Sequence, residues 1–199
     1  MHRSSIPVGI VLTVLVAVRA RTGGHRAAVI IYGICVLAML SVSGLYHAPR
    51  LSKSERRFLR RLDHSTILVA IAGTYTAVIV LALTGTTRVV LLVLTWAIAV
   101  VGILIRMFWF DAPTWVVGSV YLGAGWMLVV NPPAFFHAMS GVETGFLAAG
   151  GLLYTVGAIM FGMQKPNPWP STFGYHEVWH TFVVTAAFLH WLSIYLLAG

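Results

Sequence analysis

Long apolar runs separated by short polar connections dominate this chain. The runs are about 16 to 23 residues long, close to the length that an α-helix needs to cross a bilayer. The connections contain the expected helix breakers, such as Gly23-Gly24, Pro132-Pro133 and Pro170. The pattern predicts an all-α integral membrane protein in which residues 1–199 form a single bundle of seven transmembrane helices. The predicted spans are Ser5–Ala20, Ala27–Tyr46, Leu62–Leu83, Val89–Phe110, Trp115–Val130, Glu143–Met163 and His176–Ala198.

The first run resembles a signal peptide, because His2 and Arg3 precede an apolar stretch from Ile6 to Val18. Arg19 and Arg21 follow directly, where a cleavage site would need small residues. We therefore interpret this run as an uncleaved first helix, although it is shorter than a usual span.

Composition supports the membrane interpretation. Hydrophobic residues make up 59% of the chain and charged residues only 9%, whereas a soluble domain carries roughly a quarter charged residues. The net charge of +8 is explained by basic loops beside phospholipid headgroups, so we do not expect nucleic-acid binding. The single cysteine, Cys35, cannot form an internal disulfide and is expected to be a small buried hydrophobic residue.

The distribution of Lys and Arg predicts the orientation. With seven spans, the N-terminus and the second, fourth and sixth connections lie on one side of the membrane. That side carries nine basic residues, namely Arg3, Arg50, Lys53, Arg56, Arg57, Arg60, Arg61, Arg106 and Lys165. The other side carries four, namely Arg19, Arg21, Arg26 and Arg88. Because basic loops stay in the cytoplasm, we predict a cytoplasmic N-terminus.

The last predicted span opens with the segment His176-Glu177-Val178-Trp179-His180. Two histidines four residues apart lie on one face of a helix, one turn apart, and can offer two imidazoles to one metal ion. Ionisable residues at the mouth of an apolar span are costly, so they are candidates for function.

Further polar residues are predicted to join this histidine pair. His47 closes the second span and Asp63 opens the third, on the same side of the membrane as His176. Ser43 lies one turn before His47 on the same helix face. The proposed site therefore lies just beneath the cytoplasmic headgroups. It comprises Ser43, His47, Asp63, His176 and His180.

Three imidazoles with an open fourth position are typical of a catalytic zinc site, and Asp63 would orient or deprotonate the water there. Simpler interpretations exist for individual residues. Asp63 could pair with Arg60 or Arg61, and Ser43 could be a small residue at a helix contact. A single histidine at a helix end is often only an interfacial residue.

Two other histidines are excluded from the metal site. His64 points about 100° away from Asp63 around the helix. His190 lies ten residues after His180, about 15 Å along the axis. We interpret His190 as a packed, hydrogen-bonded histidine in preference to a residue that lines a lipid cavity.

These residues resemble the motifs of the hemolysin III family, which is related to the progestin and adipoQ receptors within a wider set of seven-span hydrolase-like proteins. The resemblance rests on three motifs in order: Ser43-Gly44-Leu45-Tyr46-His47, then Asp63-His64-Ser65 with Gly73-Thr74-Tyr75-Thr76, and finally His176 to His180 with His190. One departure is Ala77, where the family usually has proline after the G-T-Y-T stretch.

The resemblance implies a zinc ion near the cytoplasmic face, with His47, His176 and His180 as ligands. It also implies that Asp63 holds the zinc-bound water and that Ser43 lies close by. Receptors of the family are similar to ceramidases in activity, and bacterial members are named for haemolysis and linked to membrane homeostasis.

We therefore predict a multi-pass protein of the cell membrane that uses zinc to hydrolyse an amide or ester bond in a membrane lipid, or that regulates membrane lipid homeostasis. Asp63 would accept the proton of the attacking water, and Ser43 would donate a hydrogen bond to the oxyanion. Zinc would lower the pKa of that water to about 7.

Other functions remain open. The alternatives are a non-enzymatic stress sensor or receptor with structural zinc, an intramembrane H-E-x-x-H metalloprotease with Glu177 as base, and a cytolysin. A retinal protein is excluded, because the only lysines, Lys53 and Lys165, lie outside the predicted spans.

Overall fold

The computed structural model describes residues 2–49, 51–109, 111–169 and 172–199. Arg50, Phe110 and Pro170, which the sequence analysis used, lie outside these ranges. The described ranges contain eight α-helices and one short 3-10 helix, which confirms the all-α fold class. They are α1 (His2–Arg19), α2 (Gly23–Tyr46), α3 (Lys53–Ala82), α4 (Gly85–Phe108), α5 (Thr114–Gly125), η1 (Met127–Val130), α6 (Pro132–Ala138), α7 (Gly141–Met163) and α8 (Tyr175–Ala198).

Five helices of the described chain are long and apolar enough to cross a membrane, namely α2, α3, α4, α7 and α8. The apolar parts of α1 and α5 are shorter, at Ile6–Arg19 and Trp115–Gly125. The count of seven spans and the orientation of the N-terminus therefore stay predictions.

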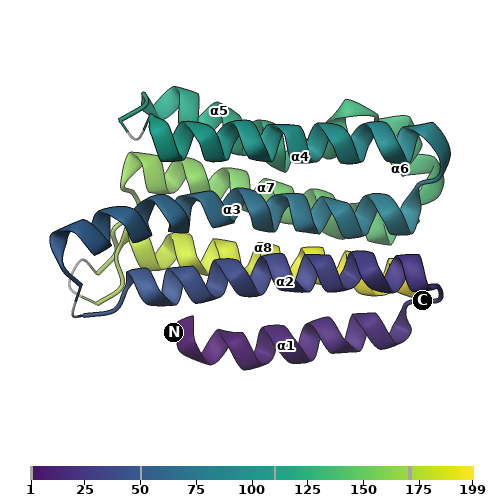
Figure 1. The fold of residues 1–199 in the computed structure, drawn as a ribbon, viewed down its shortest axis with the longest axis horizontal. Helices are drawn as coiled ribbons and strands as arrows, with labels where there is room; N and C mark the ends of the chain where they lie inside the picture. The colour runs from purple at the N-terminus through teal and green to yellow at the C-terminus, as the bar shows by residue number, and fades with distance from the viewer. Residues whose placement is uncertain (1, 50, 110, 170–171) are drawn as a thin grey trace.

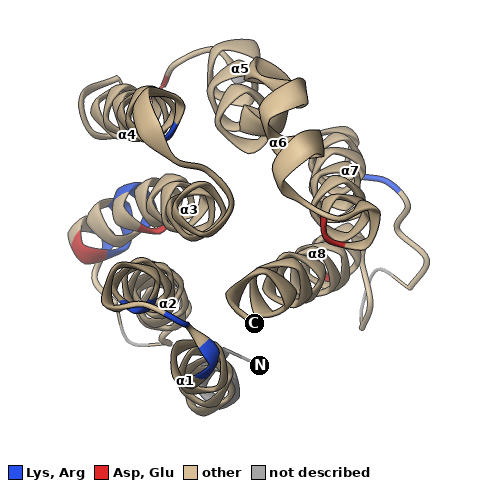
Figure 2. Ribbon diagram, turned by 90° about the vertical axis from the view of Figure 1, so that its right-hand side faces the viewer, with Lys and Arg blue, Asp and Glu red and all other residues tan. Residues whose placement is uncertain are grey.

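The helices lie side by side in one elongated bundle (Figure 1). From α1 to α5, and again from α7 to α8, successive helices run in opposite directions, so α2 ends where α3 and α8 begin (Figure 1). The view along the bundle shows α3 between α2 and α4, with α7 and α8 across from them (Figure 2). This up-and-down arrangement places the motifs of three helices at one end of the molecule.

The core is built around α3. All residues from Ala72 to Ile79 are buried, so this part of the helix is surrounded on every side. Gly73 lies in this stretch, and a Cβ there would lie only 2.6 Å from Cβ of Cys35 on α2. The small residue lets the two helix backbones approach closely, as is common between transmembrane helices. Cys35 is itself buried, as expected.

The helix α1 is tied to the bundle through α8. The Trp191 indole donates a hydrogen bond to the Leu12 carbonyl over 3.0 Å, and the Arg19 guanidinium lies 4.6 Å from the centre of the Tyr195 ring. The short first helix is therefore part of the folded bundle.

Candidate functional site

His176 and His180 lie in the first two turns of α8, with their rings facing each other. The ring centroids are 4.6 Å apart, and the two Nε2 atoms are separated by 2.9 Å. The i, i+4 spacing on one helix face produces this contact. The two Nε2 atoms are therefore within hydrogen-bond distance of each other.

His47 lies directly after the last residue of α2 and approaches the same pair. Its ring centroid is 6.2 Å from that of His176, although the side chain is largely exposed. Its Nδ1 donates a hydrogen bond to the Ser43 carbonyl over 2.9 Å. That bond places the proton on Nδ1, so Nε2 carries the lone pair, which is the form in which a histidine binds a metal.

The two remaining predicted residues lie near this end of the bundle. Ser43 is half-buried in α2, and its backbone carbonyl contacts His47. Asp63 is half-buried in α3, where its carbonyl accepts a hydrogen bond from the Thr66 hydroxyl over 2.9 Å and its carboxylate interacts electrostatically with Tyr121 of α5.

The donor set suits zinc in its chemistry and in part of its geometry. Three imidazoles from two helices gather at one end of the bundle. In a tetrahedral site with Zn–N bonds of about 2.0–2.1 Å, two ligand nitrogens are about 3.3 Å apart, close to the 2.9 Å between His176 and His180. Within the described ranges, however, no three His, Cys, Asp or Glu side chains are close enough together to hold a metal ion.

Aromatic residues form one wall beside the histidines. The Phe161 ring of α7 contacts three rings of α8, at centroid distances of 5.7 Å to Tyr175, 5.8 Å to His176 and 5.7 Å to Trp179. Gly157, one turn earlier, makes room for Trp179, because a Cβ there would lie 3.0 Å from the indole. This wall fixes the start of α8 against α7 and thereby the position of the histidine pair.

Glu177 has a structural role at the same helix start. Its carboxylate accepts a hydrogen bond from the Gly174 backbone N–H over 2.9 Å. An acidic side chain at this position satisfies one of the N–H groups that have no partner within the helix. The carboxylate is thus held at the helix N-terminus.

A polar cluster inside the bundle was not predicted. Arg106 of α4 is buried, with 6% of its surface exposed, and its guanidinium contacts Nδ1 of His64 on α3. The Tyr121 hydroxyl donates to the His64 carbonyl over 2.7 Å. The sequence analysis treated Arg106 only as a loop charge, yet a lone arginine in an apolar run is a signal that could have identified it.

His190 packs between α7 and α8, far from the other histidines along the helix. Its Nε2 donates a hydrogen bond to the Leu147 carbonyl over 3.1 Å, and its ring lies 5.5 Å from that of Tyr154. The side chain is buried, which agrees with a packed and hydrogen-bonded histidine.

The outer surface defines the class of protein. Large apolar side chains in the middle of the long helices face outward, such as Ile34, Val93 and Val184, which are 61%, 62% and 63% exposed. Such a surface is unstable in water and suits contact with lipid. With five helices long enough to span, the fold is that of a multi-pass integral membrane protein.

Comparison with known proteins gives the family. The family model for haemolysin-III related proteins matches residues 1–191, and the chain belongs to this family. It is 34% identical to the hemolysin-3 homolog of Bacillus subtilis over 154 residues, which covers 77% of this chain and 69% of that protein. It is 33% identical to hemolysin-3 of Bacillus cereus over 180 residues, covering 90% and 78%.

A more distant likeness extends to the adipoQ receptors. A stretch of 65 residues is 35% identical to the adiponectin receptor protein of Drosophila melanogaster, covering 30% of this chain and 15% of that one. The family model and the likeness to the adiponectin receptor protein agree with the resemblance seen in the three sequence motifs.

Proposed function

We propose that His47, His176 and His180 bind a zinc ion at the end of the bundle where α2 ends and α8 begins. The observation that carries this proposal is the gathering of three imidazoles from two helices, with the His176 and His180 Nε2 atoms 2.9 Å apart. The hydrogen bond from His47 to the Ser43 carbonyl supports it, because it leaves the lone pair on Nε2.

Zinc binding requires a small movement of side chains. Because no three candidate ligands of the described chain lie close enough together to hold a metal ion, His47 has to move closer to the pair. The Nε2 atoms of the pair have to separate by a few tenths of an ångström. His47 lies at a helix terminus and is exposed, so its ring has more room to move than a buried side chain would have.

We propose further that this site hydrolyses an amide or ester bond in a membrane lipid. When bound, zinc acts as a Lewis acid that makes water a nucleophile near neutral pH. Water adds to the carbonyl carbon, and the bond from that carbon to nitrogen or oxygen breaks. Asp63 accepts the proton of the water and returns it to the leaving nitrogen or oxygen, and the Ser43 hydroxyl donates a hydrogen bond to the carbonyl oxygen.

The position of the histidines supports a lipid substrate. They lie at the ends of apolar helices, which is the depth at which the acyl carbonyls of a lipid meet its headgroup. We place the protein in the cell membrane with this end toward the cytoplasm, because five basic residues in the first three turns of α3 lie there.

Metal content of the purified protein tests the zinc site. We expect about one zinc per chain in the wild type and a loss of most of it in His47→Ala and His180→Ala. His137→Ala is the matched control, because this exposed histidine lies in α6, outside the three motifs. Zinc retained unchanged in His47→Ala would contradict the three-ligand site.

Two isosteric substitutions separate hydrolysis at this site from the metalloprotease alternative. Asp63→Asn should keep zinc and lose lipid hydrolysis, whereas Glu177→Gln should keep both, because the Glu177 carboxylate is held by Gly174. Activity that depends on Glu177 and not on Asp63 would favour the protease. Zinc-loaded wild type that hydrolyses no acyl lipid would contradict the enzymatic part alone.

A further inference from the structure

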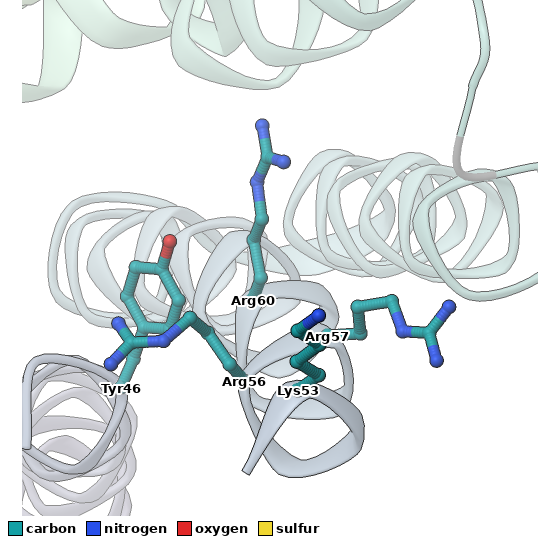
Figure 3. Close-up of a pocket in the computed structure, with 5 residues that line it drawn as sticks. All are labelled: Tyr46, Lys53, Arg56, Arg57 and Arg60. Carbon is teal, nitrogen blue, oxygen red and sulfur yellow. The ribbon is translucent and has the colours of Figure 1, made fainter. Parts of the chain in front are cut away.

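A basic pocket lies beside the candidate site, where α2 ends and α3 begins. It has a volume of about 420 Å³, within the range of ligand-binding pockets. Its lining consists of one tyrosine and four cations, namely Tyr46, Lys53, Arg56, Arg57 and Arg60 (Figure 3). The Tyr46 ring also contacts the ring of His47, at a centroid distance of 4.9 Å.

The four cations share one face of α3. Their spacing of three, four and seven residues from Lys53 keeps them within an arc of about 100° around the helix axis. Like charges at these spacings repel one another. A helix face that collects four of them therefore suits the binding of an anion.

Glu55, the acidic residue between Lys53 and Arg60, is directed elsewhere. Glu55 lies on the opposite side of the helix from the four cations, about 150° from the middle of their arc. Its carboxylate accepts hydrogen bonds from the Ser52 backbone N–H over 2.8 Å and from the Ser52 hydroxyl over 2.6 Å. Glu55 thus caps the helix instead of entering the pocket.

The surroundings of the pocket indicate a membrane lipid as the source of the anion. Tyr46 is the last residue of a membrane-spanning helix, and the apolar part of α3 begins at Leu62, so the pocket lies at the headgroup level. Phe58 and Leu45, next to the cations and to Tyr46, are 55% and 57% exposed. Exposed apolar residues beside cations are typical of segments that lie in the membrane interface.

We propose that this pocket binds the phosphate-bearing headgroup of an anionic membrane lipid. The guanidinium groups of Arg56 and Arg60 and the ammonium group of Lys53 contact the phosphate oxygens, and the Tyr46 hydroxyl, which points to the same side as Arg60, adds a donor (Figure 3). The lipid is held independently of zinc at the neighbouring histidines.

A lipid titration of the full-length protein tests this proposal. The protein in dodecyl maltoside micelles is titrated with phosphatidylglycerol or with phosphatidylcholine of the same acyl chains. The unfolding midpoint, followed by tryptophan fluorescence, rises as a ligand binds the folded state. We expect a clearly larger rise with phosphatidylglycerol, and equal rises with the two lipids would overturn the proposal.

Charge-neutral variants locate the effect. Lys53→Gln/Arg56→Gln should weaken the apparent affinity for phosphatidylglycerol about 25-fold, at about fivefold for each cation removed. Arg21→Gln/Lys165→Gln removes the same charge from exposed positions outside the pocket and should retain the wild-type affinity. Equal weakening in both double variants would indicate a general charge effect and overturn the site.

Inorganic phosphate separates a lipid from a free anion. At the concentration of phosphatidylglycerol that half-saturates the wild type, phosphate alone should leave the unfolding midpoint unchanged. The lipid assignment would be overturned if phosphate stabilised the wild type as much as the lipid does but did not stabilise Lys53→Gln/Arg56→Gln. The pocket would then be a site for a soluble anion.

Discussion

At the residue level, the contact between Gly150 and His190 sets how closely α7 and α8 approach. A Cβ at Gly150 would collide with the imidazole of His190 and lie 3.1 Å from the Ala186 carbonyl. The same imidazole donates to the Leu147 carbonyl, one turn before Gly150. The glycine therefore provides the space in which the hydrogen-bonded ring lies.

Gly150→Ala should destabilise the protein. The added methyl group forces the His190 ring from its position and lengthens its bond to Leu147, and overpacking of this kind costs about 1–3 kcal/mol. Gly151→Ala is the control, because a Cβ at Gly151 would meet nothing within 4 Å. Thermal unfolding in detergent measures both variants, and equal midpoints would contradict the close contact.

The sequence predicted the burial of single residues but not the contacts between side chains of different helices. A packed His190 was the preferred interpretation of a histidine too far along the helix for the metal site, and the burial of Cys35 followed from its place in an apolar run. The contact between His64 of α3 and Arg106 of α4 joins two residues that are 42 positions apart in the sequence. Helix periodicity gives the direction of each side chain but not which neighbouring helix it meets.

At the level of elements, the break between α5 and η1 is held by a side chain of α3. The Tyr75 hydroxyl donates to the carbonyl of Gly125, the last residue of α5, over 2.7 Å. It accepts a hydrogen bond from the Leu128 N–H over 3.4 Å. A buried hydroxyl thus bonds with backbone groups at a place where the helix is interrupted.

Tyr75→Phe should lower the free energy of unfolding by about 1–3 kcal/mol, because it removes the hydroxyl that both backbone groups use in a buried site. Tyr195→Phe is the matched control, since it keeps the ring that stacks on Trp191 and lies under Arg19. Chemical unfolding in detergent compares the two. A change at Tyr195 as large as that at Tyr75 would contradict this account.

Five of the predicted apolar spans coincide with long apolar helices, whereas the predicted span Trp115–Val130 is broken after Gly125, and several helix boundaries were not predicted. The run from Leu62 to Leu83 covers the apolar part of α3, whereas the helix begins at Lys53, directly after its N-cap Ser52, which forms a capping box with Glu55. A Ser-x-x-Glu pattern is a readable start signal, but hydropathy does not register it. The short α6 was expected only as a connection, because Pro132-Pro133 was interpreted as a breaker, whereas proline also suits the first turn of a helix.

At the level of the whole molecule, the alternating directions of the helices bring distant motifs together. From the order of the spans alone, the ends of α2 and the starts of α3 and α8 were expected on one side, and they lie at one end of the bundle (Figure 1). What the span order could not give is the rotation of each helix about its axis. That rotation sets the 6.2 Å between the ring centroids of His47 and His176.

A zinc ion bound by the three histidines would act as a cross-link between two helices. In the fold, α2 packs mainly on α1 and α3, while α8 packs mainly on α7. A metal that binds only the folded state stabilises it by about 2.7 kcal/mol at a free concentration one hundred times its dissociation constant. The proposed site therefore predicts that metal removal weakens the whole bundle.

Chelation should accordingly lower the unfolding midpoint of the wild type by about 5–10 °C. The same chelator should have little effect on His47→Ala, because the two histidines of α8 alone cannot link the helices. His137→Ala should respond as the wild type does. Since this measurement needs no substrate, it separates metal binding from catalysis: an unchanged wild-type midpoint after verified metal removal would show that zinc does not hold α2 to α8.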